Sequence, residues 1–328
     1  MATSKQQRID PKKVSAAVAR GKSKRPGGRP PGAPVVKKAT PADWIAGARI
    51  RTLPLAIAPV ALGTATALVL LDGEHEYKLA VLCLVVALAL QIAVNYANDY
   101  SDGIRGTDKH RVGPSRLTGS GAAKPRTVLT VALVFFGIAA IAGIAIVVLT
   151  GYYWLLAIGA VCIVAAWFYT GGKRPYGYNA LGELFVFIFF GLVATAGTTF
   201  VQAGTVNLET WVAAVSIGLI ACAVLVVNNI RDIEPDRAAG KRTLSVLIGR
   251  TASRVLFAVF LLLPFVILPF FLFVYYNAGY AYVALLTAIP AVIIASTAKQ
   301  PGEFVIALRL ASLTGLIYGI ALALAIAL

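Results

Sequence analysis

The chain has 328 residues, of which 59% are hydrophobic and 13% are charged, and its formal net charge at pH 7 is +16. Soluble globular domains carry about a quarter charged residues, so this composition excludes an ordinary soluble protein. Apolar runs of about 18 residues or more, without polar–apolar alternation, predict membrane-spanning helices rather than a barrel. The expected fold class is therefore an all-α membrane protein.

The first region along the chain, residues 1–40, is strongly basic. It contains eleven Lys or Arg residues and one acidic residue, Asp10. A polar segment rich in Pro and Gly cannot bury a core, so we expect a disordered cytoplasmic tail. Its charge suits anionic lipid headgroups, and a specific binding partner is the alternative. Residues 41–328 form the predicted transmembrane domain.

Nine apolar segments follow the tail and are expected to cross the membrane as helices. They cover residues 53–71, 79–97, 127–149, 153–170, 182–203, 211–229, 253–275, 279–297 and 304–327. Lys and Arg accumulate in the tail and after the even-numbered segments, whereas the other loops carry one basic residue, Lys78. Because cytoplasmic loops are enriched in Lys and Arg, we expect a multi-pass plasma-membrane protein with its N-terminus in the cytoplasm and Leu328 outside.

Two acidic motifs end the second and sixth apolar segments, and four crossings between them place both on the same side of the membrane. The first motif runs from Asn95 to Asp108 and the second from Asn228 to Asp236. Side chains three and four residues apart share one face of a helix. Each motif therefore predicts a stripe of amide and carboxylate oxygens: Asn95, Asn98, Asp99 and Asp102 in the first, and Asn228, Asp232 and Asp236 in the second, with Asn229 beside them.

These oxygen-rich stripes favour a divalent metal site. Hard oxygen ligands suit Mg²⁺, with Mn²⁺ as the alternative, and neither stripe contains a thiol or an imidazole. Mg²⁺ is commonly held by one or two carboxylates together with substrate phosphates, and basic residues follow both motifs. Solvated helix ends are the simpler interpretation, but two similar clusters on one membrane face favour a functional site.

Basic and aromatic residues outside the stripes extend the candidate site. Four of them are candidates for binding phosphate oxygens: Arg51, Lys124, Arg231 and Lys241. A guanidinium fork matches phosphate oxygens and lysine supplies a point charge, although each could instead only set the orientation in the membrane. A third polar stretch, residues 169–179, contains Tyr169 and Arg174. The aromatic run that follows, from Phe185 to Phe190, either faces lipid or lines a slot for an apolar substrate tail.

The two motifs resemble the Asp-rich signatures of the UbiA superfamily of intramembrane aromatic prenyltransferases. The resemblance covers residues 44–328 and implies a bundle of nine transmembrane helices around a central cavity open to the cytoplasmic side and to lipid. Residues 51–54, 108–121 and 240–244 are most similar to the subfamily of the menaquinone pathway, the 1,4-dihydroxy-2-naphthoate polyprenyltransferases. The basic tail is a departure from a minimal member of this family.

The resemblance, taken with the stripes and the basic residues, predicts three groups of site residues. The metal–diphosphate ligands are expected to be Asn98, Asp102, Asp232 and Asp236, supported by Asp99 and Asp108. The catalytic residues are expected to be Asp99, Asp102, Asp232, Asp236 and Lys241. The substrate-binding residues are expected to be Arg51, Asn95, Lys124, Tyr169, Arg174, Asn229 and Arg231.

The resemblance implies Mg²⁺-dependent transfer of a polyprenyl group from polyprenyl diphosphate to 1,4-dihydroxy-2-naphthoate, with loss of CO₂, giving demethylmenaquinol or its oxidised form, demethylmenaquinone. The expected partners are these two substrates and membrane lipid, with no nucleic acid, and the oligomeric state stays open. Three alternatives stay open as well. They are a related transferase for another acceptor such as 4-hydroxybenzoate or homogentisate, a cation-coupled transporter with carboxylates near the membrane midplane, and a CDP-alcohol phosphotransferase with one contiguous aspartate signature.

Overall fold

The computed structural model describes residues 38–73, 76–110 and 116–328. Across these ranges the chain is helical and contains no β-strand, so the predicted all-α class is confirmed. The predicted basic tail lies almost wholly outside the described residues, and so do residues 111–115 of the basic stretch after the first motif.

The helices of the first half include α4, whose C-terminal end carries the first acidic motif. They are α2 (Pro41–Gly47), η1 (Ile50–Thr52), α3 (Pro54–Leu70), α4 (Tyr77–Arg105), η2 (Thr107–His110), α5 (Pro125–Thr150), α6 (Leu155–Phe168) and η3 (Tyr176–Tyr178).

The helices of the second half include a π-helical stretch, η4, between α7 and α8. They are α7 (Gly182–Val186), η4 (Phe187–Val193), α8 (Ala194–Ala203), α9 (Leu208–Arg231), α10 (Ile233–Ala238), α11 (Leu244–Ile267), α12 (Pro269–Leu272), η5 (Tyr276–Ala284), α13 (Leu285–Thr297) and α14 (Pro301–Ala327).

A helix lies in each of the nine predicted segments, but not every one is long enough to cross a membrane. Within the described ranges, seven helical stretches pass by length and composition, and an eighth passes if the pair Pro41–Thr52 and Pro54–Leu70, bent by 46°, counts as one span. The segment predicted at 153–170 forms α6, which has 14 residues. The structure therefore supports a multi-pass membrane protein, and the count of nine stays a prediction.

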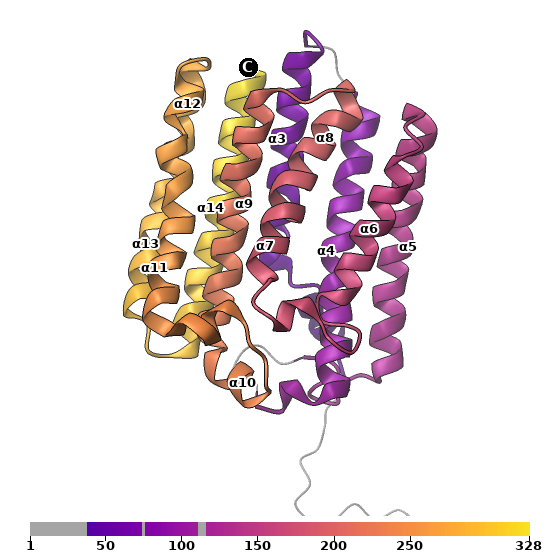
Figure 1. The fold of residues 1–328 in the computed structure, drawn as a ribbon, viewed down its shortest axis with the longest axis vertical. Helices are drawn as coiled ribbons and strands as arrows, with labels where there is room; N and C mark the ends of the chain where they lie inside the picture. The colour runs from indigo at the N-terminus through magenta and orange to yellow at the C-terminus, as the bar shows by residue number, and fades with distance from the viewer. Residues whose placement is uncertain (1–37, 74–75, 111–115) are drawn as a thin grey trace, which may run out of the picture. The chain divides into compact units, whose positions relative to one another are not determined.

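The main hydrophobic core lies between α3, α9, α11 and α14, which contribute fully buried side chains such as Leu62, Ile217, Phe257 and Tyr318. A smaller core joins α4 to α5. Figure 1 shows α5 and α6 on one side of the bundle and α11 to α13 on the other. Close packing at the centre needs small residues, because a Cβ atom on Gly191 would lie 2.6 Å from Cα of Gly218 in α9.

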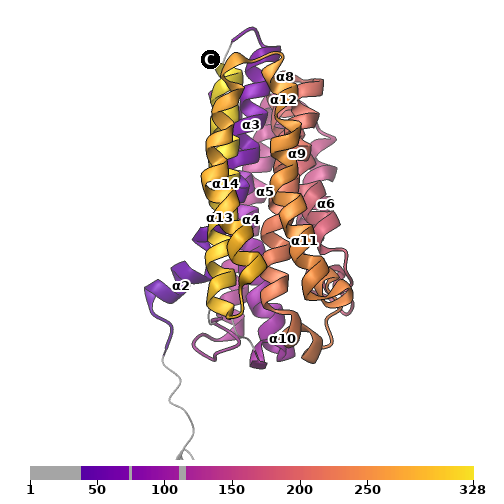
Figure 2. The same cartoon turned by 90° about the vertical axis from the view of Figure 1, so that its left-hand side faces the viewer.

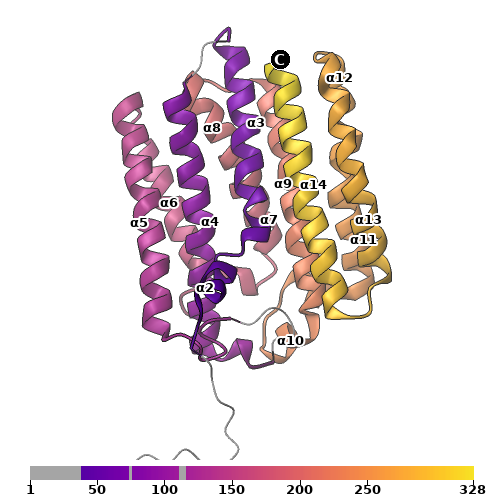
Figure 3. The ribbon, with the colours of Figure 1, turned by 180° about the vertical axis from the view of Figure 1, so that it is seen from behind.

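The ends of α4 and α9 that carry the acidic motifs lie at the same end of the bundle, next to α10, and the C-terminus lies at the opposite end (Figure 1). Seen from behind, α3 and α4 run side by side, and α2 lies near the end of the bundle that carries the motifs (Figure 3). The side view shows α2 at this same level (Figure 2). It is held on α4 because the Tyr96 hydroxyl donates to the Trp44 carbonyl at 2.6 Å.

Candidate functional site

Asp102, in the last turn of α4, carries a buried carboxylate of the first motif, and only 1% of the residue is exposed. Oδ2 lies 3.3 Å from Nζ of Lys241 and 3.3 Å from Nη2 of Arg116. Oδ1 accepts a hydrogen bond from the hydroxyl of Tyr178. Hydrogen bonds to an ionised group are stronger than neutral ones, so these partners fix the orientation of a buried anion.

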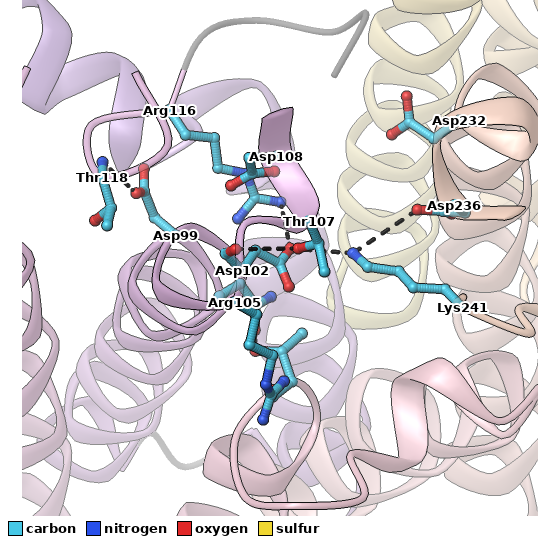
Figure 4. Close-up of polar contacts among 12 residues, drawn as sticks. Asp99, Asp102, Arg105, Thr107, Asp108, Arg116, Thr118, Asp232, Asp236 and Lys241 are labelled. Carbon is cyan, nitrogen blue, oxygen red and sulfur yellow. Dashed lines mark hydrogen bonds and ion pairs between the residues drawn. The ribbon is translucent and has the colours of Figure 1, made fainter. Parts of the chain in front are cut away.

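Lys241 joins the two acidic motifs. Its Nζ lies 3.3 Å from Asp102 Oδ2 and 3.7 Å from Asp236 Oδ1 (Figure 4). Its own backbone N–H donates to the carbonyl of Asp236 at 2.8 Å, which fixes the turn after α10. Carboxylates from the ends of two different helices therefore face the same ammonium group, as the shared membrane face of the motifs predicts.

Asp99, one turn earlier on α4, holds a loop. Its two carboxylate oxygens accept the backbone N–H groups of Leu117 at 2.9 Å and Thr118 at 2.8 Å. The loop lies tightly on α4 beside it, because a Cβ atom on Gly103 would come 2.3 Å from Cγ2 of Thr118. Asp99 thus places the loop that carries Arg116, while its predicted role as a metal ligand stays a prediction.

Arg116 lies among the acids of the first motif. Besides Asp102 it faces Asp108, whose Oδ1 lies 3.6 Å from Nε. Burial works against the charge of the guanidinium, but the surrounding carboxylates, Asp102 and Asp108 foremost, raise its pKa above the ordinary value. Arg116 therefore remains a cation at any physiological pH.

The second motif differs from the continuous stripe that its spacing predicts. The helix breaks at Asp232, which lies between the last residue of α9 and the first residue of the short helix α10. Arg231 donates to both oxygens of Asp232, at 2.8 and 2.5 Å, and to Oδ1 of Asn228 at 2.8 Å. The prediction of one helical face from Asn228 to Asp236 is therefore wrong, because the last residue lies on another helix.

The remaining predicted site residues fall into two groups. Those in the first group are tied to other parts of the fold: the Asn95 amide donates to the Ala48 carbonyl at 3.0 Å, Asn98 accepts from the Thr170 hydroxyl at 2.6 Å, Asn229 donates to Glu183 at 3.0 Å, and the Tyr169 ring lies 5.5 Å from that of Tyr176. The second group, Lys124 and Arg174, is exposed, and within the described part of the chain no ion pair joins either residue to the acidic motifs.

A polar recess lies beside the motifs, between η1 and the ends of α4 and α9. Its walls include Arg49, Arg51, Asp99, Arg116 and Arg231. The positive charge of Arg309 on α14 also acts on Arg51. Arg116 and Arg231 also pair with acids of the two motifs, but four guanidinium groups and one carboxylate line the recess itself, and guanidinium forks match the oxygens of an anion.

Within the residues that the structure describes, no three or more His, Cys, Asp or Glu side chains converge on one point as a ready metal centre. Mg²⁺ does not need such a cluster, because one or two carboxylates suffice when substrate phosphates complete the coordination shell. Asp102, Asp232, Asp236 and Asn98 offer only hard oxygen donors. The donor set therefore fits Mg²⁺ bound together with a phosphorylated ligand.

Two residues of the site were missing from the predicted set: Arg116 and Tyr178. Both lie in loops, Arg116 after α4 and Tyr178 after α6, and each reaches Asp102 from another segment. Burial, and then the Asp102 carboxylate, raises the pKa of Tyr178 well above its ordinary value, so the phenol stays protonated and donates. Helical spacing predicts neighbours on one helix, and it does not predict which loops fold back onto that helix.

Comparison with known proteins gives relatives at high sequence identity. The chain is 53% identical over 216 residues to the 1,4-dihydroxy-2-naphthoate octaprenyltransferase of Mycobacterium tuberculosis, covering 66% of this chain and 73% of the relative. It is 39% identical over 217 residues to the protein of the same name in Escherichia coli, covering 64% and 70% of the two chains.

The fold is shared with solved structures at much lower identity. A UbiA homologue from Aeropyrum pernix K1 has a TM-score of 0.64 at 16% identity, covering 83% of this chain and 97% of that one. A UbiA homologue from Archaeoglobus fulgidus, bound to DMAPP and Mg²⁺, has a TM-score of 0.60 at 13% identity, covering 86% and 99%. The profile of the UbiA prenyltransferase family matches residues 56–303. This chain therefore belongs to the UbiA prenyltransferase family.

Proposed function

We propose that this protein transfers a polyprenyl group from polyprenyl diphosphate to 1,4-dihydroxy-2-naphthoate, releasing diphosphate and CO₂, as a step of menaquinone synthesis. The observation that carries the proposal is the bridge from Asp102 through Lys241 to Asp236, which brings both acidic motifs to one cationic centre at the end of an apolar bundle. The relatives at 53% and 39% identity, both 1,4-dihydroxy-2-naphthoate octaprenyltransferases, support this choice of acceptor.

Asp102, Asp232, Asp236 and Asn98 would hold Mg²⁺, which when bound neutralises the diphosphate leaving group. The Mg²⁺-bound homologue from A. fulgidus supports this cofactor. Lys241 and Arg116 add positive charge that is already in place before the C1–O bond of the donor breaks, which favours the transition state without reorganisation. The electrons of that bond leave with the diphosphate, and an allylic cation remains.

The acceptor supplies the electrons for the new bond. An electron-rich naphthoate ring attacks the allylic cation, and loss of the carboxyl group as CO₂ restores the aromatic ring. The arginine-lined recess, with Arg51 and Arg231 in its wall, lies beside the acidic motifs and suits an acidic acceptor. Burial of the reaction within the bundle keeps water away from the cation.

The apolar chain of the donor needs a path into lipid. An apolar groove runs along α6, η3 and α7, with Val164, Phe168, Tyr176 and Phe185 in its wall. Tyr176 stacks on Phe185 at 4.1 Å, and Tyr176 belongs to the same loop as Tyr178 of the site. A polyprenyl tail in this groove would leave its diphosphate close to Asp102.

The orientation and the number of crossings belong to the same proposal. The bent pair of α2–η1 with α3, and the short helix α6, would add the eighth and ninth crossings to the seven long stretches. Because the loops at the site end are rich in Lys and Arg, this end would face the cytoplasm of a plasma-membrane protein, with Leu328 outside. A cytoplasmic opening gives a water-soluble acceptor direct access.

The direct test is turnover by the purified protein in lipid nanodiscs, followed by mass spectrometry of the prenylated product. We expect product from 1,4-dihydroxy-2-naphthoate with Mg²⁺, release of labelled CO₂ from a carboxyl-¹³C acceptor, and no product in EDTA. A parallel panel with 4-hydroxybenzoate and homogentisate separates the alternative acceptors. Full activity in EDTA, or preference for another acceptor, would contradict the proposal.

A further inference from the structure

Tyr178 lies between the two acidic motifs although it belongs to neither. It ends η3, in the loop between α6 and α7. Its hydroxyl donates to Asp102 Oδ1, and its ring lies 4.5 Å from Nζ of Lys241. One side chain therefore contacts both the acid and the cation of the pair that joins the motifs.

The loop that carries Tyr178 is fixed on both sides. On the α4 side, the Arg105 guanidinium donates to the carbonyls of Thr170 and Gly172 and lies 5.5 Å from the Tyr178 ring. On the α11 side, the Tyr178 carbonyl accepts the backbone N–H of Arg242 at 2.8 Å. Tyr178 is thus attached to the segments that carry Asp102 and Lys241, and its position depends on both.

These contacts restrict the positions of two side chains, Lys241 and Asp102. A lysine side chain is long and flexible, and its ammonium group has no preferred direction, so an unrestrained Lys241 could pair fully with either acid. A ring face 4.5 Å away attracts the ammonium group and limits where it can lie. The phenol occupies Oδ1 of Asp102, which leaves Oδ2 for Lys241 and Arg116.

We infer that Tyr178 is a positioning residue of the prenyl transfer reaction: it aims the Asp102 carboxylate and holds Lys241 between the two acidic motifs, so that both motifs can bind a metal–diphosphate group together. This inference rests on the proposed function. It assigns Tyr178 no contact with substrate, because its effect passes through Asp102 and Lys241.

Tyr282 in η5 provides a control outside the proposed site. Its hydroxyl donates to the Phe265 carbonyl at 3.2 Å, and its ring stacks on Phe265, so it is a partly buried, hydrogen-bonded tyrosine that packs on its neighbour. If Tyr178 only helped to pack the loop, removing either hydroxyl would have a similar effect. If it positions Asp102, the two substitutions must differ in the reaction and not in stability.

The experiment compares Tyr178→Phe, Tyr178→Leu and Tyr282→Phe in nanodiscs. For Tyr178→Phe we expect kcat to fall about 10- to 100-fold, the size of a lost hydrogen bond to a charged group. We also expect the Mg²⁺ concentration for half-maximal activity to rise at least about threefold. For Tyr178→Leu we expect a further rise in KM for the prenyl diphosphate, because Lys241 also loses its ring. Tyr282→Phe should retain kcat and Mg²⁺ dependence within about twofold, and both Phe variants should unfold at similar temperatures.

A second measurement separates this inference from the proposed function. Calorimetric binding of a prenyl thiolodiphosphate with Mg²⁺ needs no acceptor and no turnover, so it applies even if the acceptor is wrong. We expect Tyr178→Phe to weaken this binding and Tyr282→Phe to leave it unchanged. Equal losses in both variants, or full binding and kcat in Tyr178→Phe, would overturn the positioning role. Failure of the wild-type protein to prenylate the naphthoate would overturn the proposed function alone.

Discussion

The two acidic motifs are built in different ways. The first lies on the unbroken end of α4, where Asp99 and Asp102 are almost fully buried and are held by a loop, two cations and a phenol. The second spans a helix break, and Asp232 and Asp236 are paired with chain neighbours, Arg231 and Lys241. The first motif is therefore held mainly by residues distant in the chain, whereas the acids of the second motif pair with near neighbours in the chain.

This difference separates stability from activity. Removing one partner of a buried ion pair leaves a charge uncompensated, which costs about 3–5 kcal/mol. Asp236 is less buried than Asp102, with 13% against 2% of its side chain exposed, and its pair with Lys241 is longer, so its removal should cost less. We therefore expect substitution of Asp102 to lower both turnover and stability, whereas substitution of Asp236 should lower turnover with a smaller effect on stability.

The largest effect is expected for Asp102→Asn. The variant removes the charge that faces Lys241 and Arg116, so turnover should fall by about 10³-fold, and the free energy of unfolding should fall by about 3 kcal/mol. Product formation and thermal unfolding in detergent measure the two effects. The matched variant, Asp236→Asn, should lose comparable turnover but unfold within a few degrees of the wild type. Equal destabilisation by both variants would remove the contrast between the motifs.

Part of this contrast follows from the sequence and part does not. Apolar run length is enough to predict the helical class, and the even-numbered positions of the motifs predict that they lie at one end of the bundle. The stripe on α4 also follows from spacing, because that helix continues without a break to Arg105. The break at Asp232 also has a cause in the sequence, which helical spacing alone overlooks: Pro235 has no N–H to donate to the Arg231 carbonyl four residues earlier, and its ring crowds that carbonyl.

Contacts between segments limit prediction most. Helical spacing predicts that Asp99 is a metal ligand, whereas in the structure both its oxygens accept backbone N–H groups from a loop 18 or 19 residues away. Tyr178 reads as one of several aromatic residues in a polar loop, yet it reaches Asp102 across 76 residues of sequence. Such pairings depend on how the loops pack over the helix ends, and periodicity within one segment carries no information about them.

A smaller effect is expected for Arg116→Met. Asp102 still faces Lys241 in this variant, so turnover should fall by about 10²-fold, less than for Asp102→Asn. The double variant Arg116→Met with Asp102→Asn tests whether the two residues act as a unit. We expect its loss to be smaller than the sum of the single losses, with a coupling energy of about 1–3 kcal/mol. Additive losses would mean that Arg116 acts independently of Asp102.

Gly103→Ala tests how tightly the loop that contains Thr118 packs on α4, and it changes no charged residue. The added Cβ atom would meet Thr118 at 2.3 Å and the Gly119 nitrogen at 3.1 Å, so the loop must move and its bonds to Asp99 must weaken. We expect a loss of about 1–3 kcal/mol in stability and a severalfold loss in turnover. Gly137→Ala on α5 is the control, because a Cβ atom there meets nothing within 4 Å. A tolerated Gly103→Ala would show that the loop is not held tightly by Asp99.

The smallest effect is expected for Glu234→Gln, although Glu234 belongs to the second motif as fully as Asp236 does. Its side chain is 67% exposed and pairs with Arg237 at 3.0 Å, on the outer side of α10. An exposed ion pair of this kind contributes less than about 1 kcal/mol, so turnover should stay within about twofold and the unfolding temperature should not change measurably. Asp236, two residues later, faces Lys241, so its substitution should instead lower turnover strongly. Loss of activity in Glu234→Gln would mean that α10 rotates when substrate binds, so that the broken second motif, unlike the first, takes its working arrangement only with ligand present.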